Sequence, residues 1–199
     1  LNIDINGRNS KSLKKFYGFN INNDRSRKEG LNFSAPIKIS LQDALNTDAI
    51  ALRLVGWYDY HFADSLQLAV KNTHHAYGLY VAFADAVNLN DDLTINFSGN
   101  TESYGIYNYN YYYGISPDDE ENQNILKIKT AAIYNEGGKS TAVWTRDDSI
   151  TIISESLTTN AQEALYARDQ GIIEVQRDFA TTAESMISAW NNGTVIINS

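Results

Sequence analysis

The stretch AYGLYVAFADAVNLNDDLTINFSGNTESYGIYN, residues 76–108, contains two sequence patterns that recur along the chain. The first pattern is an apolar residue, a polar residue and a second apolar residue, as in Leu93-Thr94-Ile95. The second is a small residue followed by an apolar one, as in Tyr77-Gly78-Leu79-Tyr80 and Tyr104-Gly105-Ile106-Tyr107. Alternation with a period of two is typical of a strand with one buried and one solvated face. Both patterns therefore predict short β-strands.

We identify eight copies of the first pattern; the outer positions are Ile, Leu or Val in all eight, and the middle residue is polar or charged in seven. Successive copies are separated by 34, 29, 27, 33, 24, 23 and 22 residues, so the smallest repeating unit is near 22 residues. The copies are Ile3-Asp4-Ile5, Ile37-Lys38-Ile39, Leu66-Gln67-Leu68, Leu93-Thr94-Ile95, Leu126-Lys127-Ile128, Ile150-Thr151-Ile152, Ile173-Glu174-Val175 and Val195-Ile196-Ile197.

The second pattern lies between these copies, and polar or Gly-containing turns close the units. Turn residues of this kind tolerate tight or left-handed backbone. The predicted turns are Asn90-Asp91-Asp92, Asp147-Asp148, Asp169-Gln170-Gly171 and Asn191-Asn192-Gly193. Copies of the second pattern are Tyr17-Gly18-Phe19, Ala51-Leu52, Tyr77-Gly78-Leu79-Tyr80, Tyr104-Gly105-Ile106-Tyr107, Ala142-Val143-Trp144, Ala164-Leu165-Tyr166 and, as a less regular match, Met186-Ile187.

Units of two or three short strands, with no helical periodicity between them, predict an all-β, right-handed parallel β-helix of about seven coils. A leucine-rich repeat would need a regular Leu pattern, and a propeller blade needs about 40 residues. An antiparallel sandwich stays open as an alternative. We expect one domain over residues 1–199, in which 1–125 form coils with inserted loops and 126–199 form near-minimal coils.

Composition argues against several classes of protein. The 199 residues include 16 Lys and Arg against 24 Asp and Glu, and the net charge of −8 disfavours nucleic-acid binding. There is no Cys for a disulfide or a zinc-cysteine site. The chain has neither a run of about 18 apolar residues, as a membrane-spanning helix would need, nor a signal peptide at its start.

Residues 76–108 and their degenerate copies resemble the β-helical passenger domains of Gram-negative autotransporter adhesins, and the resemblance covers nearly the whole chain. It implies an extracellular segment on the cell surface, which the full-length protein anchors to the outer membrane through a C-terminal barrel. The absence of Cys fits passage of an unfolded passenger through a narrow pore. Because the chain has no barrel or terminal caps of its own, we expect it to be a segment of a longer passenger.

An aromatic column is the most specific candidate for recognition. Tyr80, Tyr107, Trp144 and Tyr166 follow the inward apolar residue in four successive units, so alternation turns them outward. Such a ladder would offer a stacking platform to sugar rings or to a flat partner. The alternative is that the stacked rings only stabilise the solenoid.

A Tyr-rich loop is the second candidate, because Tyr gives rigid contact area at low entropic cost. Its predicted binding residues are Tyr107, Tyr109, Tyr111 and Tyr113; in the alternative, the loop only packs on its neighbouring coil. The acidic run that follows, at 118–121, lacks the spacing of a calcium loop and indicates a solvated surface.

A third candidate is a surface aromatic patch at Trp57, Tyr58 and Tyr60, with ordinary packing as the alternative. His61, His74 and His75 lie near it in the sequence. Neighbouring strand residues point to opposite faces, so we do not expect His74 and His75 to share a metal ion. We predict no metal site and no cofactor.

Catalysis would require paired carboxylates in a groove. Asp147, Asp148 and Asp169 recur at nearly the same turn, but turn geometry explains them without chemistry. The leading prediction is therefore a non-catalytic adhesin segment that binds a protein or glycan of a host or neighbouring cell. A structural stalk and a polysaccharide-acting β-helix enzyme are the rival predictions, and self-association is a further possible mode of binding.

Overall fold

The computed structural model describes residues 1–7, 15–22, 30–56, 59–110, 124–182 and 185–198, and within them every regular element is a β-strand. No helix that could span a membrane lies in this part of the chain. The strands are β1 (Asn2–Asn6), β2 (Lys15–Asn22), β3 (Leu31–Phe33), β4 (Ile37–Gln42), β5 (Asp48–Val55), β6 (Asp59–Phe62), β7 (Leu66–Lys71), β8 (His75–Ala82), β9 (Ala86–Ser98), β10 (Glu102–Tyr109), β11 (Ile125–Glu136), β12 (Lys139–Arg146), β13 (Ile150–Thr159), β14 (Glu163–Arg168), β15 (Ile172–Val175), β16 (Asp178–Thr181), β17 (Met186–Trp190) and β18 (Thr194–Ile197).

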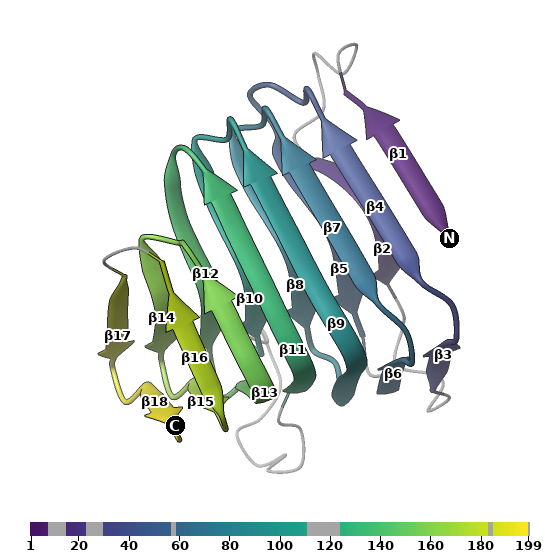
Figure 1. Ribbon diagram of the computed structural model, residues 1–199. Coiled ribbons are helices and arrows are strands. Elements are labelled where there is room, and N and C mark those ends of the chain that lie inside the picture. The colour runs from purple at the N-terminus through teal and green to yellow at the C-terminus, as the bar shows by residue number, and fades with distance from the viewer. Residues whose placement is uncertain (8–14, 23–29, 57–58, 111–123, 183–184, 199) are drawn as a thin grey trace.

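The strands form two sheets that face each other across the core (Figure 1). The path through the 11-stranded sheet is β1-β4-β7-β9-β11-β13-β15-β18, and β3, β6 and β16 pair with strands on this path or with each other. The 7-stranded sheet has the order β17-β14-β12-β10-β8-β5-β2. Pairing is parallel in both sheets, for example between β4 and β7 and between β8 and β10. The prediction of an all-β fold is thus confirmed, and its sheets are parallel.

The chain visits the two sheets in turn, so each strand pairs with its counterpart from the next pass. In the larger sheet Ile39 pairs with Leu68, and Leu68 pairs with Ile95. The long strands change partner along their length: β9 pairs first with β6 and then with β7. A register shift between Ile128 and Thr130 of β11 marks the same place in the next strand. Such irregularities bend a strand and increase its twist.

The core lies between the sheets and is made of inward-facing aliphatic residues. Strand β4 shows the underlying alternation, because Ile37, Ile39 and Leu41 are buried while the residues between them are more exposed. Branched aliphatic side chains suit such a half-buried, pleated surface. All eight predicted copies of the first pattern lie in strands, so the prediction of strands at these places is confirmed.

The copy Ile150-Thr151-Ile152 nevertheless has the opposite orientation from the one expected. Thr151 and Ile153 are fully buried, whereas Ile150 and Ile152 are only partly buried. The prediction is wrong by one residue, because a shift of one position sends every side chain of a strand to the other face. The buried Thr151 hydroxyl lies 2.7 Å from the Thr145 hydroxyl. The hydrogen bond between them replaces the one that Thr151 would make to water in the unfolded chain.

Two further expectations about the repeat are wrong. Leu126 is not the counterpart of Leu93, because Leu126 pairs with Val87 and Leu93 pairs with Ala131. The predicted turn Asn90-Asp91-Asp92 lies within β9, where the strand bends without ending. Both errors arise because long strands contain two pairing segments, which the sequence pattern does not separate.

Candidate functional site

The strands of the 7-stranded sheet bend at a pair of successive buried residues. In a regular strand neighbouring side chains point to opposite faces. In β8, however, Gly78 and Leu79 are both buried, as are Gly105 and Ile106 in β10. The second sequence pattern coincides with this bend, and its apolar residues share one register position along the sheet, from Phe19 through to Ile187.

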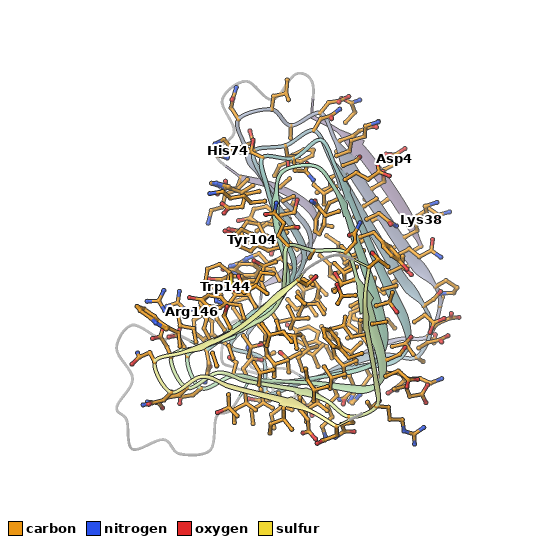
Figure 2. All side chains as sticks on the ribbon, turned by 60° about the vertical axis from the view of Figure 1, so that its left-hand side comes forward. Asp4, Lys38, His74, Tyr104, Trp144 and Arg146 are labelled. Atoms are coloured by element: carbon orange, nitrogen blue, oxygen red, sulfur yellow. The ribbon has the colours of Figure 1, made fainter. Side chains whose placement is uncertain are left out.

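The bend makes the outer face of this sheet concave. Tyr77 and Tyr80 flank the buried pair of β8, and their ring centroids lie 5.8 Å apart. In Figure 2 Tyr104 and Trp144 lie within the concave side, while Asp4 and Lys38 lie on the far side of the molecule. We call this hollow the aromatic groove, and it is formed by Tyr77, Tyr80, Tyr104, Tyr107, Tyr109, Trp144 and Tyr166.

The predicted column of Tyr80, Tyr107, Trp144 and Tyr166 occupies one register position on four adjacent strands. The rings of Tyr80 and Tyr107 stack at 5.4 Å with an angle of 12° between their planes. Trp144 lies 5.1 Å from both Tyr107 and Tyr166, at angles of 68° and 64°. The predicted alignment of the column is confirmed. Because the two tyrosine rings cover each other's facing surfaces, the groove presents their edges and hydroxyl groups.

A second column, missed as a candidate for binding, runs beside the first. Tyr77 and Tyr104 pair in register and stack at 5.0 Å with an angle of 18°. Tyr109 closes the other side of the groove, where the Tyr80 hydroxyl donates a hydrogen bond of 2.8 Å to the Tyr109 hydroxyl. The signal was present in the sequence, because Tyr77 and Tyr104 begin the same four-residue pattern that ends in Tyr80 and Tyr107.

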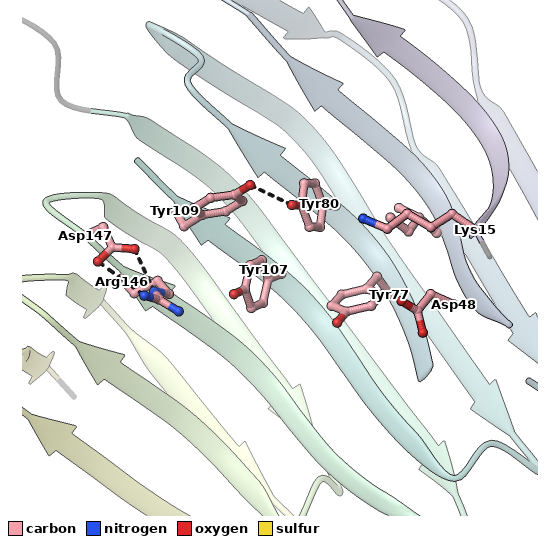
Figure 3. A pocket seen from close by; sticks show the side chains of 9 residues that line it. Lys15, Asp48, Tyr77, Tyr80, Tyr107, Tyr109, Arg146 and Asp147 are labelled. Atoms are coloured by element: carbon pink, nitrogen blue, oxygen red, sulfur yellow. Dashed lines mark hydrogen bonds and ion pairs between the residues drawn. The ribbon is translucent and has the colours of Figure 1, made fainter. Parts of the chain in front are cut away.

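A pocket of about 210 Å³ lies along the groove (Figure 3). Its lining comes from β2, β5, β8, β10 and β12 and the turn after β12, so it crosses five adjacent strands of the sheet. Four strand spacings correspond to a length of about 19 Å. Residues that line it are Lys15, Asp48, Ile50, Tyr77, Tyr80, Tyr107, Tyr109, Arg146 and Asp147.

The charges at the C-terminal ends of β12 and β14 are paired. Arg146 Nε lies 2.6 Å from Asp147 Oδ2, and Arg168 Nε lies 2.9 Å from Asp169 Oδ2. Burial lowers the pKa of Arg146, but the ion pair with Asp147 outweighs this effect and leaves the pKa raised. Each of the two arginines therefore has a neighbouring aspartate that balances its charge.

Burial keeps four of the groove phenols protonated. It is the largest cause of the raised pKa of Tyr77, Tyr80, Tyr104 and Tyr107. For Tyr80 the hydrogen bond to Tyr109 raises the pKa further, whereas for Tyr107 the Arg146 guanidinium opposes the rise. Since these phenols are neutral, each keeps a hydroxyl proton; that of Tyr80 is donated to Tyr109, so toward a ligand the Tyr80 oxygen can act only as an acceptor.

Comparisons with protein-family models, curated proteins and solved structures found no match to this chain. The function of the groove is therefore inferred from its geometry and chemistry.

The other predicted binding residues have different outcomes. Tyr60 is fully buried in the core, with 0% of its surface accessible to solvent. Its hydroxyl donates a hydrogen bond to the Val55 carbonyl at 3.3 Å. Its predicted place in a surface patch is wrong, because Tyr60 is on the inward side of β6. Trp57, Tyr58, Tyr111 and Tyr113 lie outside the described residues.

The two neighbouring histidines lie closer together than expected. His74 precedes β8, where strand alternation does not yet apply, and its ring lies 4.1 Å from the ring of His75. The prediction that they point to opposite faces is wrong. His75 Nδ1 lies 2.8 Å from Asp48 Oδ1, and its Nε2 lies 3.4 Å from Glu102 Oε2. In the part of the chain that the structure describes, no cluster of His, Asp and Glu could hold a metal ion.

Asp147, Asp148 and Asp169 lie in turns, as predicted. Their φ angles are 54°, 57° and 50°, a left-handed conformation that Asp tolerates better than most residues. The Ser149 amide donates to the Arg146 carbonyl at 3.4 Å and closes the first of these turns. Burial, followed by the charge of Asp147, raises the pKa of Asp148.

Proposed function

We propose that this chain is a segment of a surface-displayed adhesin of the autotransporter passenger type. It would bind a protein or glycan of a host or neighbouring cell through the aromatic groove, without catalysis or a cofactor. At the level of the fold, we propose a right-handed parallel β-helix of about seven coils. The alternating visits to two parallel sheets support this fold, because parallel crossover connections are right-handed in nearly all proteins.

The observation that supports a binding role best is the concave shape of the aromatic surface. Exposed patches rich in Tyr and Trp are typical of recognition surfaces, since their rings are rigid and carry polar groups. The groove of about 210 Å³ crosses five strands, so its floor offers an elongated contact surface. The phenol hydroxyls add directional hydrogen bonds to that surface.

The packing of the rings also supports the alternative of a structural stalk. The pairs Tyr77–Tyr104 and Tyr80–Tyr107 stack between neighbouring strands, and such pairs stabilise a sheet whether or not a ligand binds. A test must therefore remove the groups that face the ligand while it keeps the rings in place.

The double substitution Tyr107→Phe and Tyr109→Phe meets this requirement, because only two hydroxyls are lost. We expect the native chain to bind a member of an array of glycans and extracellular proteins, and the double variant to bind it at least about tenfold more weakly. Tyr134→Phe is the matched control, since Tyr134 lies on the 11-stranded sheet and is 38% exposed. Equal binding by the double variant would refute the groove as the site, and a folded protein that binds nothing would favour the stalk.

A further inference from the structure

Arg53 lies beside the aromatic groove, where neighbouring side chains hold its guanidinium group in place. It occupies the same register position as Asn20 on one side and Tyr80 on the other. Its guanidinium carbon lies 5.7 Å from the centroid of the Tyr17 ring and 5.6 Å from that of Tyr80. The Nη1 group donates a hydrogen bond of 3.0 Å to Asn20 Oδ1. The side chain is thus held between two rings before any ligand arrives.

Arg53 differs from the other arginines of this face in its charge balance. Arg146 and Arg168 each form an ion pair with a neighbouring aspartate. Within the described residues Arg53 forms none, and Asn20 uses only one of its five N–H donors. Asp48, on the same strand, lies five residues away, or about 16 Å along the strand, and contacts His75. Arg53 therefore has donors and positive charge to offer in a protein whose net charge is −8.

A guanidinium with free donors is the side chain best suited to binding a carboxylate in two-point fashion. The neighbouring groove floor consists of ring edges and neutral phenol hydroxyls, which suit a polyhydroxylated chain. An extended peptide would instead seek unpaired backbone groups at a sheet edge. Strands β5, β8, β10 and β12 offer no such edge, since each pairs on both sides.

We propose that Arg53 is an anion subsite of the aromatic groove and that the ligand is an acidic glycan. The glycan lies across the strands, with one carboxylate on the Arg53 guanidinium and its hydroxyls on the phenols of Tyr80 and Tyr109. The inference rests on the proposed function, because it assigns a ligand class and a polar contact to the same groove.

The test is binding of the native chain to immobilised carboxylated glycans, including uronic-acid and sialic-acid types, and to the same glycans after reduction of the carboxyl groups to alcohols. We expect a carboxylated glycan to bind and its reduced form to bind at least about tenfold more weakly. Binding should also weaken as the salt concentration rises. The variant Arg53→Gln should lose about the same factor for the carboxylated glycan and little for the reduced one.

Arg168→Gln is the matched control, because Arg168 also lies over an aromatic ring, with its guanidinium carbon 5.1 Å from the Trp190 centroid. It should bind the acidic glycan like the native protein, and thermal melts should show that both variants are folded. Equal binding of acidic and reduced glycans, or full binding by Arg53→Gln, would overturn the anion subsite. Binding of a neutral glycan or a protein that depends on Tyr107 and Tyr109 would overturn the acidic ligand and leave the proposed function intact. No binding to any array member would overturn both.

Discussion

At the scale of single residues, the ionisation of three groove tyrosines is coupled to the stability of the fold. Tyr77, Tyr80 and Tyr104 have a pKa above the ordinary value, chiefly because burial disfavours the phenolate. In the unfolded chain the same phenols ionise near a pH of about 10. Their contribution to native stability is therefore complete below that pH and is lost as the pH rises toward the native-state values.

We expect ultraviolet absorbance to show late ionisation for part of the 13 tyrosines. The phenols of Tyr77, Tyr80 and Tyr104 should form phenolate only together with the loss of β-sheet circular dichroism, at a pH above about 10. The substitution Tyr80→Phe should remove one phenol from this late group. If every tyrosine ionised near its ordinary pKa while the circular dichroism stayed constant, the groove phenols would not be desolvated as described.

At the scale of strands, the bend of the 7-stranded sheet depends on the size of one residue in each pass. A Cβ atom added at Gly105 would lie 2.5 Å from the Ala142 carbonyl oxygen and 2.7 Å from Ile133 Cγ2 of the opposite sheet. Both distances are shorter than van der Waals contact, and the first involves backbone. The glycine therefore permits β10 to pack closely against the Ala142 carbonyl and the Ile133 side chain at the bend.

We expect Gly105→Ala to lower the free energy of unfolding by about 1–3 kcal/mol, as overpacking in a filled core does. Urea denaturation followed by circular dichroism measures the change. Gly30→Ala is the control, because a Cβ there would meet nothing nearer than 3.5 Å, and its stability should stay within about 0.5 kcal/mol. Unchanged stability of Gly105→Ala would show that the sheets can separate without cost.

The sequence predicts the strands well and the register less well, for a physical reason. The second pattern identifies the bend, because a small residue before an inward apolar residue marks two successive buried positions. The error at Ile150 and Ile152 arises because aliphatic residues also occur on the outer face, so composition alone does not distinguish the two faces. The Arg53 setting could not be predicted, since its partners Asn20 and Tyr80 are 33 and 27 residues away and meet only through the register.

At the scale of the whole molecule, stability is expected to vary along the stack of strands. Each strand contacts mainly its two neighbours within a sheet, so opening at one side breaks few interactions elsewhere. Val143, Leu165 and Ile187 share one register position, yet the first two are fully buried and Ile187 is 45% exposed. Strands β17 and β18 are shorter than β10 and β12, pair on one side only and are less buried.

We expect native-state hydrogen exchange to follow this gradient. Amides of β10 and β12 should exchange only through global unfolding, whereas those of β17 should exchange at least about 100-fold faster, a difference of about 3 kcal/mol. Trp190→Ala, in β17, should speed exchange there and leave β10 unchanged, because the Trp190 ring is 63% exposed and lies beside Arg168 of the neighbouring strand β14. Uniform protection across both sheets would instead mean that the strands unfold as one cooperative unit. A substitution in β17 would then lower the stability of the aromatic groove as much as a substitution inside the groove does.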